Sequence, residues 1–64
     1  METIVQFLRP RDAFMARGRR HEIKYVHRDG ANKRVFVNGS SADGQYFEAT
    51  FDWGETVDTL ADTL

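Results

Sequence analysis

The chain has 64 residues, enough for one domain and close to the lower limit for folding without a covalent or metal staple. It contains no cysteine, which excludes disulfides and thiolate metal sites, and its formal net charge is −1. We therefore expect a single small domain over residues 1–64, stabilised by packing or by association.

The two signs of charge are separated along the sequence. All nine Lys and Arg lie at or before Arg34, together with four acids, which gives this part a charge of +5. From Val35 onward there are six acids and no base, which gives −6. Such a split can mark a partner-binding face. The alternative is that the two halves compensate each other once they are folded together.

Residues 1–3 are acidic rather than basic, and no apolar run of about 7–15 residues follows them, so a secretory signal is not expected. No segment is long and apolar enough to span a bilayer. The sequence predicts a cytoplasmic protein that makes no membrane contact.

In chain order, residues 3–8 are rich in β-branched and aromatic side chains, and both the odd- and the even-numbered positions carry apolar residues. This pattern predicts a strand that is covered on both faces. Pro10 ends that strand, because proline cannot donate to a ladder. Two interpretations of residues 9–20 stay open. Residues 12–17 form a short helix that Gly18 terminates, or the whole segment is a mobile basic loop.

The middle of the chain predicts two antiparallel strands. Residues 21–28 form one, with Ile23 and Tyr25 on one face and Lys24, Val26 and Arg28 on the other. Residues 29–32 are a turn signal of hairpin length, and residues 33–37 form the next strand. Residues 38–44 predict a polar loop, because they are rich in residues that tolerate positive φ.

The last twenty residues change period. Residues 45–53 alternate, which predicts a half-buried strand whose inner face carries Phe47, Ala49, Phe51 and Trp53. The pattern then changes to a helical stripe with spacing i, i+3, i+4 and i+7, formed by Val57, Leu60, Ala61 and Leu64.

The predicted helix has two candidate N-caps. Asp52 and Glu55 have the spacing of a capping box, which makes Asp52 one candidate, and Thr56 is the other.

These elements predict an α+β fold: a small antiparallel meander of three or four strands with one C-terminal helix packed on a face. The expected core beneath the helix consists of Val5, Phe7, Ile23, Tyr25, Val35, Val37 and the inner side chains of residues 47–53. Five apolar side chains are left on the other face: Ile4, Leu8, Val26, Phe36 and Tyr46. The sequence leaves open three ways to bury these side chains: the sheet curls into a small barrel, the chain forms a homodimer, or a partner binds.

Catalytic and metal chemistry have little support in the sequence. His21 and His27 are six residues apart on one predicted strand, about 20 Å, so they cannot share an ion. Ser40 and Ser41 lie in a turn-like loop with no nucleophile-elbow sequence around them. The glycines of residues 39–44 have the spacing of a phosphate loop, but its lysine is missing. We expect no enzyme activity, no cofactor and no metal.

A binding function is the remaining hypothesis. Seven of the nine cations are Arg, which suits planar recognition of carboxylate or phosphate. The first interpretation is a regulatory protein that binds a larger protein partner. The alternative is a nucleic-acid-binding module, although a pI of about 6.0 disfavours it. Both use the same predicted contact residues: Arg17, Arg19, Arg20, Lys24, Arg28, Arg34, Phe36 and Tyr46.

Overall fold

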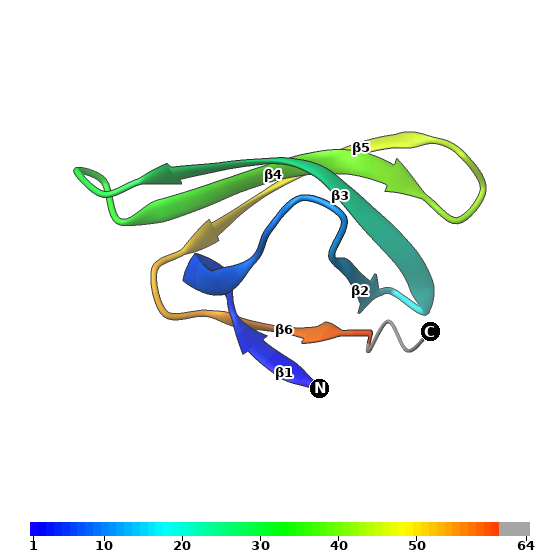
Figure 1. Ribbon diagram of the computed structural model, residues 1–64, viewed down its shortest axis with the longest axis horizontal. Coiled ribbons are helices and arrows are strands. Elements are labelled where there is room, and N and C mark those ends of the chain that lie inside the picture. The colour runs from blue at the N-terminus through cyan, green and yellow to red at the C-terminus, as the bar shows by residue number, and fades with distance from the viewer. Residues whose placement is uncertain (61–64) are drawn as a thin grey trace.

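The computed structural model describes residues 1–60, and these residues form one antiparallel sheet of six strands in the order β1-β6-β2-β3-β4-β5 (Figure 1). Within residues 1–60 the only helical element is a short 3₁₀ turn, η1, so the predicted α+β class is wrong and the fold is all-β. No described helix is long and apolar enough to cross a membrane. The elements are β1 (Glu2–Ile4), η1 (Val5–Phe7), β2 (Ala13–Ala16), β3 (Arg19–Asp29), β4 (Arg34–Ser41), β5 (Tyr46–Asp52) and β6 (Thr56–Thr59).

Strands β3, β4 and β5 form a meander of two consecutive hairpins, as the sequence predicts. The turn between β3 and β4 is closed by the Asp29 carboxylate, which accepts hydrogen bonds from the backbone N–H of Asn32 at 3.2 Å and its Nδ2 at 2.8 Å. The turn between β4 and β5 contains Gly44 with φ of +85°, a conformation that favours glycine. β4 continues to Ser41, so the first four of the seven residues in the predicted loop are strand.

The predicted C-terminal helix is replaced by β6, which lies between β1 and β2. Thr3 pairs with Val57, and Met15 pairs with Asp58. Short apolar patterns fit either period, and Thr56, Val57 and Thr59 are β-branched, which favours a strand once partners exist on both sides. The positions Ala61 and Leu64 of the predicted stripe lie outside the described residues.

The expected capping box forms a turn. The Asp52 N–H donates to the Glu55 carboxylate at 2.6 Å, and the Glu55 N–H donates to the Asp52 carbonyl at 3.1 Å. Gly54, with φ of +92°, reverses the chain between them. Only one of the two capping-box bonds is therefore present, the one that the Glu55 carboxylate accepts, because the Glu55 N–H bonds the Asp52 backbone carbonyl and not its side chain. The chain leaves this turn as β6 rather than as a helix.

The segment predicted as a helix or a loop contains β2, which pairs with β3 on one side and β6 on the other. Arg17 and Gly18 connect β2 to β3 with φ of +54° and +73°. Two residues with positive φ are typical of a type I′ turn, whose twist matches that of a hairpin. Gly18 therefore marks a hairpin turn and not a helix end.

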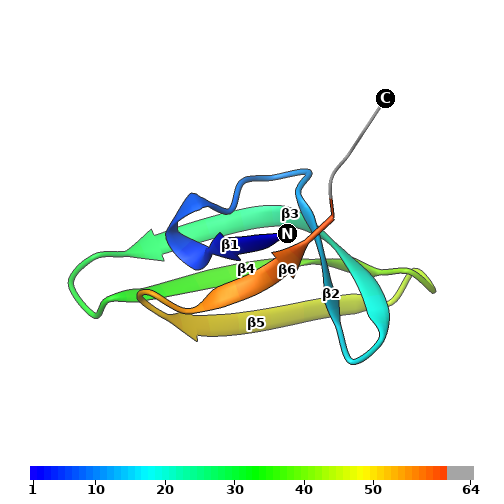
Figure 2. The same ribbon diagram turned by 90° about the horizontal axis from the view of Figure 1, so that it is seen from below.

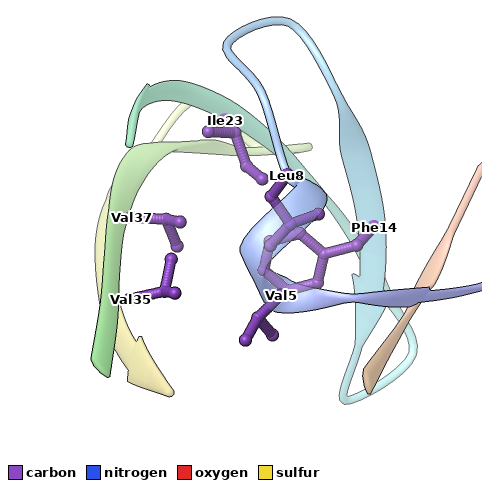
Figure 3. Packing of buried hydrophobic residues seen from close by; sticks show 6 residues of the cluster. All are labelled: Val5, Leu8, Phe14, Ile23, Val35 and Val37. Atoms are coloured by element: carbon purple, nitrogen blue, oxygen red, sulfur yellow. The ribbon is translucent and has the colours of Figure 1, made fainter. Parts of the chain in front are cut away.

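The predicted first strand is correct only as far as Ile4. Residues 5–7 turn into η1, and the Val5 N–H donates to the Glu55 carbonyl at 2.9 Å. Three residues complete one 3₁₀ turn, so Val5 and Leu8 both point into the core (Figure 3). Phe7 lies outside the core and is 67% exposed, which corrects its predicted place.

A bulge in β3 changes which side chains face inward. Ile23 pairs with Gly39, but the next pair is Tyr25 with Asn38, so Lys24 is the extra residue. After the bulge Val26 lies on the same side as Ile23 and packs against the core, whereas Tyr25 lies on the other side. The predicted alternation is therefore correct before Lys24 and reversed after it.

The sheet bends so that β1 and β6 lie opposite β4 and β5, with η1 between them (Figures 1 and 2). This space holds the core, which Figure 3 shows from close by. Over residues 1–60 the sheet remains open, with β1 and β5 as its edges, so these residues do not close into a barrel. The buried cluster consists of Val5, Leu8, Phe14, Ile23, Val35 and Val37.

Candidate partner-binding surface

The face of β3, β4 and β5 that points away from the core is termed the outer sheet face. Because Val35 and Val37 are buried, their neighbours Arg34 and Phe36 must lie on the opposite side of β4. The strand register then places the corresponding residues of β3 and β5 on the same side. This face consists of Arg20, Glu22, Lys24, Tyr25, His27, Asp29, Arg34, Phe36, Asn38, Ser40, Tyr46, Glu48, Thr50 and Asp52.

Three aromatic rings lie on the outer sheet face. Tyr25 is 50% exposed and meets the half-buried Phe36 edge-to-face, with ring centroids 6.4 Å apart. Tyr46 is 65% exposed, and its hydroxyl donates to Glu48 Oε2 at 2.7 Å. That hydrogen bond to Glu48 raises the pKa of Tyr46, so the hydroxyl remains a neutral donor.

Three of the predicted cations, Arg20, Lys24 and Arg34, share this face with the rings. Lys24 projects from the bulge and lines a shallow hollow of about 280 Å³ together with Asn38 and Tyr46. The Arg34 guanidinium lies 3.7 Å from the Asp52 carboxylate, with both side chains largely exposed. An exposed pair of this kind contributes about 0–1 kcal/mol to stability, so Arg34 can exchange this partner for another.

Arg28 is not on the outer sheet face, because the bulge turns it inward. Its Nε donates to the Gln6 carbonyl at 2.7 Å, and a terminal nitrogen donates to the Leu8 carbonyl at 2.5 Å. Arg28 thus donates hydrogen bonds to two carbonyls of the η1 segment and connects that segment to β3. The structure separates it from the other predicted contact residues.

The remaining predicted cations belong to the hairpin of β2 and β3. Arg19 forms an exposed ion pair with Asp43 at 3.3 Å, and with Arg17 it lines a hollow of about 410 Å³ that reaches Tyr46. Arg20 is exposed and pairs in register with Met15. Arg20 therefore lies on the outer sheet face, whereas Arg17 and Arg19 lie on the core side of the same end of the sheet, beside His21 and Phe47, and Tyr46 connects the two regions.

The outer sheet face is electrostatically mixed. It carries three cations, Arg20, Lys24 and Arg34, against four carboxylates, which are Glu22, Asp29, Glu48 and Asp52. The ion pairs of Arg19 with Asp43 and Arg34 with Asp52 join the basic half of the sequence to the acidic half. Folding therefore places the two signs of charge side by side on one surface.

A second surface, missed in the sequence, is an apolar groove between β5 on one side and β2 and β6 on the other. We call it the β5 groove; its volume is about 510 Å³. The alternation of Phe47, Ala49 and Phe51 indicates an apolar strand face, but the predicted C-terminal helix would cover that face. The groove is lined by Phe14, Met15, Ala16, Arg17, His21, Phe47, Glu48, Ala49, Phe51, Thr56, Val57 and Asp58.

Aromatic side chains form one end of the β5 groove. The His21 ring stacks on Phe14 with centroids 5.4 Å apart and meets Phe47 edge-to-face at 4.8 Å. His21 Nδ1 donates to the Arg19 carbonyl at 3.0 Å, because a carbonyl oxygen can only accept. His21 is therefore held as part of the groove wall.

Among residues 1–60, no three His, Asp or Glu side chains lie close enough together to hold a metal ion. No family model matches the sequence, and no curated protein or solved structure is detectably similar to it.

Proposed function

We propose that this chain is a non-catalytic interaction protein that binds a larger protein partner through the outer sheet face. The observation that supports this most is the group of Tyr25, Phe36 and Tyr46, two of them at least half exposed, on one face of a rigid meander. Tyr and Arg are the residue types that most often dominate protein interfaces, because they combine large contact area with directed polar atoms.

The balance of charge favours protein over nucleic acid as the partner. A nucleic-acid surface gains its affinity from an excess of cations around the stacking rings. Here four carboxylates lie among three cations, and Glu48 accepts a hydrogen bond from the Tyr46 hydroxyl. Phosphates approaching Tyr46 would meet that carboxylate. A protein surface of mixed charge can instead match both signs.

The basic end of the hairpin extends the proposed surface. Arg17 and Arg19 line the hollow that reaches Tyr46, so a partner seated on the ring also reaches their guanidinium groups. Ion pairs at the rim of an interface chiefly affect the rate and specificity of association. We therefore assign affinity to the aromatic rings and selectivity for an acidic partner to Arg17, Arg19 and Arg20.

The test uses an aromatic substitution on the proposed surface with a matched control elsewhere. Tyr46→Ser removes a ring that is 65% exposed on the outer sheet face, and Phe7→Ser removes one that is 67% exposed on η1. Proteins captured from cell extract are identified for the wild type and both variants. The retained partner is then purified and its Kd measured.

We expect Tyr46→Ser and Tyr25→Ser to weaken the purified complex at least tenfold, about 1.4 kcal/mol, with Phe7→Ser close to wild type. Equal weakening by Phe7→Ser would show that the surface is wrong. A parallel titration with oligo-dT at low salt tests the alternative. Tight binding that falls with salt and with Lys24→Ala would replace the protein partner by nucleic acid.

A further inference from the structure

Strand β5 has an unpaired edge whose backbone groups can be assigned. The Ser41 N–H donates to the Gln45 carbonyl at 2.8 Å, and the Trp53 N–H donates to the Lys33 carbonyl at 2.8 Å. Partners in an antiparallel ladder alternate, so the odd-numbered residues from 45 to 53 bond to β4. Tyr46, Glu48, Thr50 and Asp52 therefore direct their N–H and C=O groups to the free side.

Three of these residues keep their backbone groups available. Both groups of Asp52 are already bonded by Glu55. Tyr46, Glu48 and Thr50 each present one N–H and one C=O at the edge, and no described strand pairs with them. An unpaired row of this kind is a template for one more strand.

The β5 groove lies beside this free edge. The inward side chains of β5 are Phe47, Ala49 and Phe51, which are only partly buried although they pack against the core. The volume of the groove, about 510 Å³, lies within the range of about 300–1,000 Å³ that is usual for ligand pockets. A strand added to β5 would direct every second side chain into it.

We propose that the free edge of β5 and the β5 groove bind an extended segment of another protein as a seventh, antiparallel strand. The segment alternates apolar residues with Lys or Arg. Its apolar side chains lie opposite Phe47, Ala49 and Phe51 and enter the groove. Its cationic side chains lie opposite the even-numbered residues of β5, on the outer side of the sheet.

Charge complementarity specifies the basic residues. On β5 both charged side chains, Glu48 and Asp52, are carboxylates. In the opposite wall of the groove Asp58 is paired with the N-terminal ammonium at 2.8 Å and Arg17 is a cation, so the negative charge that selects a basic segment lies on β5 itself. Opposite charges directly across an antiparallel pair are stabilising, and like charges are destabilising. The same acids disfavour a second copy of this chain as the occupant, because pairing two β5 edges would bring acidic strands together.

This inference goes beyond the proposed function, because the edge and groove are separate from the rings of Tyr25 and Phe36. The experiment titrates the protein against a fluorescein-labelled peptide of eight residues that alternates Lys and Val, and follows anisotropy. Two control peptides have the same length. One alternates Glu and Val, and the other places four Lys before four Val, which keeps the charge but abolishes the alternation.

We expect the alternating Lys–Val peptide to bind at least tenfold tighter than either control. N-methylation sharpens the test without changing the protein. The Lys residues face the even-numbered residues of β5, so their amides bond to the edge, whereas the Val amides point to solvent. Methylating the Lys amides should abolish binding, and methylating the Val amides should leave the Kd within about threefold.

Variants of Thr50 test the same edge from the protein side. Thr50→Pro removes an edge N–H and leaves the ladder to β4 intact, a place where proline is tolerated. Thr50→Val keeps the N–H. We expect a loss of at least tenfold for Thr50→Pro and a Kd near wild type for Thr50→Val. Tyr25→Ser should leave peptide affinity unchanged, which separates this site from the outer sheet face.

Several results would overturn the proposal. The first is that the alternating peptide does not bind at about 1 mM, which is a weak affinity for a specific complex. The second is that the block peptide binds equally well. The third is that the Kd does not depend on which amides are methylated. If Thr50→Pro does not fold, the methylated peptides decide the question by themselves. A concentration-dependent dimer that excludes the peptide would identify a second copy as the occupant and refute the proposal.

Discussion

The meander of β3, β4 and β5 and the arm of β1, β6 and β2 are built by different rules. The meander strands have 11, 8 and 7 residues and pair with their neighbours in sequence. The arm strands have 3 or 4 residues, and β1 meets β6 from the other end of the chain. Each meander hairpin closes a short loop. In the arm, β2 is joined to β3 by a tight turn, but β6 meets β1 and β2 only when distant segments come together.

This difference separates recognition from support. The meander carries the outer sheet face and the free edge of β5, and its long hairpins keep both in register. The arm supplies the far wall of the β5 groove and encloses the core through η1. We therefore expect destabilising substitutions in the meander to unfold the whole domain, and those in the arm first to disorder the wall of the β5 groove.

The largest effect is expected for Gly39→Ala, in the meander. A Cβ at this position would lie 1.9 Å from the Glu22 carbonyl oxygen, which is backbone and cannot rotate away. We expect a loss of more than about 3 kcal/mol, which a domain of this size, stabilised by roughly 3–5 kcal/mol, does not survive. Urea unfolding measures it, with Gly30→Ala as control because Gly30 has open space and no positive φ.

Leu8→Ala tests the arm and its contact with the meander. Leu8 is fully buried beside Ile23 and Phe14, so its truncation should cost about 3 kcal/mol, while the exposed Phe7→Ala should cost little. Amide exchange then compares the two regions. We expect protection to fall in β1 and β6 while the β3–β4 hairpin keeps more of it. Equal loss everywhere would mean that the molecule opens as one unit.

Arg28→Met tests the hydrogen bonds by which Arg28 of the meander connects to the η1 segment. Methionine keeps the apolar length of the side chain but leaves the carbonyls of Gln6 and Leu8 without their donor. Hydrogen bonds from charged groups contribute about 1.5–3 kcal/mol, so we expect a loss of about 2 kcal/mol. Lys24→Met is the matched control on the same strand. If both variants lose the same stability, Arg28 does not connect the regions.

The smallest effect is expected from acid titration of the β4–β5 turn. Ser41 Oγ donates to the Asp43 carboxylate and lowers its pKa below the ordinary value of 3.8. A depressed pKa gives stability that is present above the ordinary value and is lost as the pH falls through the lowered one. Asp43→Asn should therefore melt below wild type at pH 6, and the gap should close below pH 3.8. A gap independent of pH would exclude the carboxylate as its cause.

The strands of the meander could be predicted because alternation and turn residues agree there. Residues 21–28 and 45–53 each alternate over enough positions to predict a strand, and the turn residues of 29–32 and 38–44 separate these strands from the one between them. The arm has no comparable alternation of apolar and polar residues. The four residues of β2 include good helix formers, and only pairing with β3 and β6 makes them a strand.

The candidate site was predicted in part for the same reason. Phe36, Tyr46 and Arg34 lie on one face because β4 and β5 are regular. Arg28 was misplaced because the bulge at Lys24 shifts the alternation by one residue, and a single sequence carries no clear sign of a bulge. The β5 groove was missed because the last segment was assigned to a helix, which would have covered Phe47 and Phe51.

The sequence by itself determined the two hairpins of β3, β4 and β5 with their turns, the separation of charge and the absence of thiol chemistry, because these depend on residues that are neighbours or on composition alone. Tertiary structure decided the strand identity of β2 and β6, the inward turn of Arg28 and the open edge of β5. β2 and β6 pair with each other although they are distant in sequence, and their hydrogen bonds and buried area outweigh the weak local preference of four residues. The inward turn of Arg28 follows from the bulge at Lys24, which forms only when β3 pairs with β4.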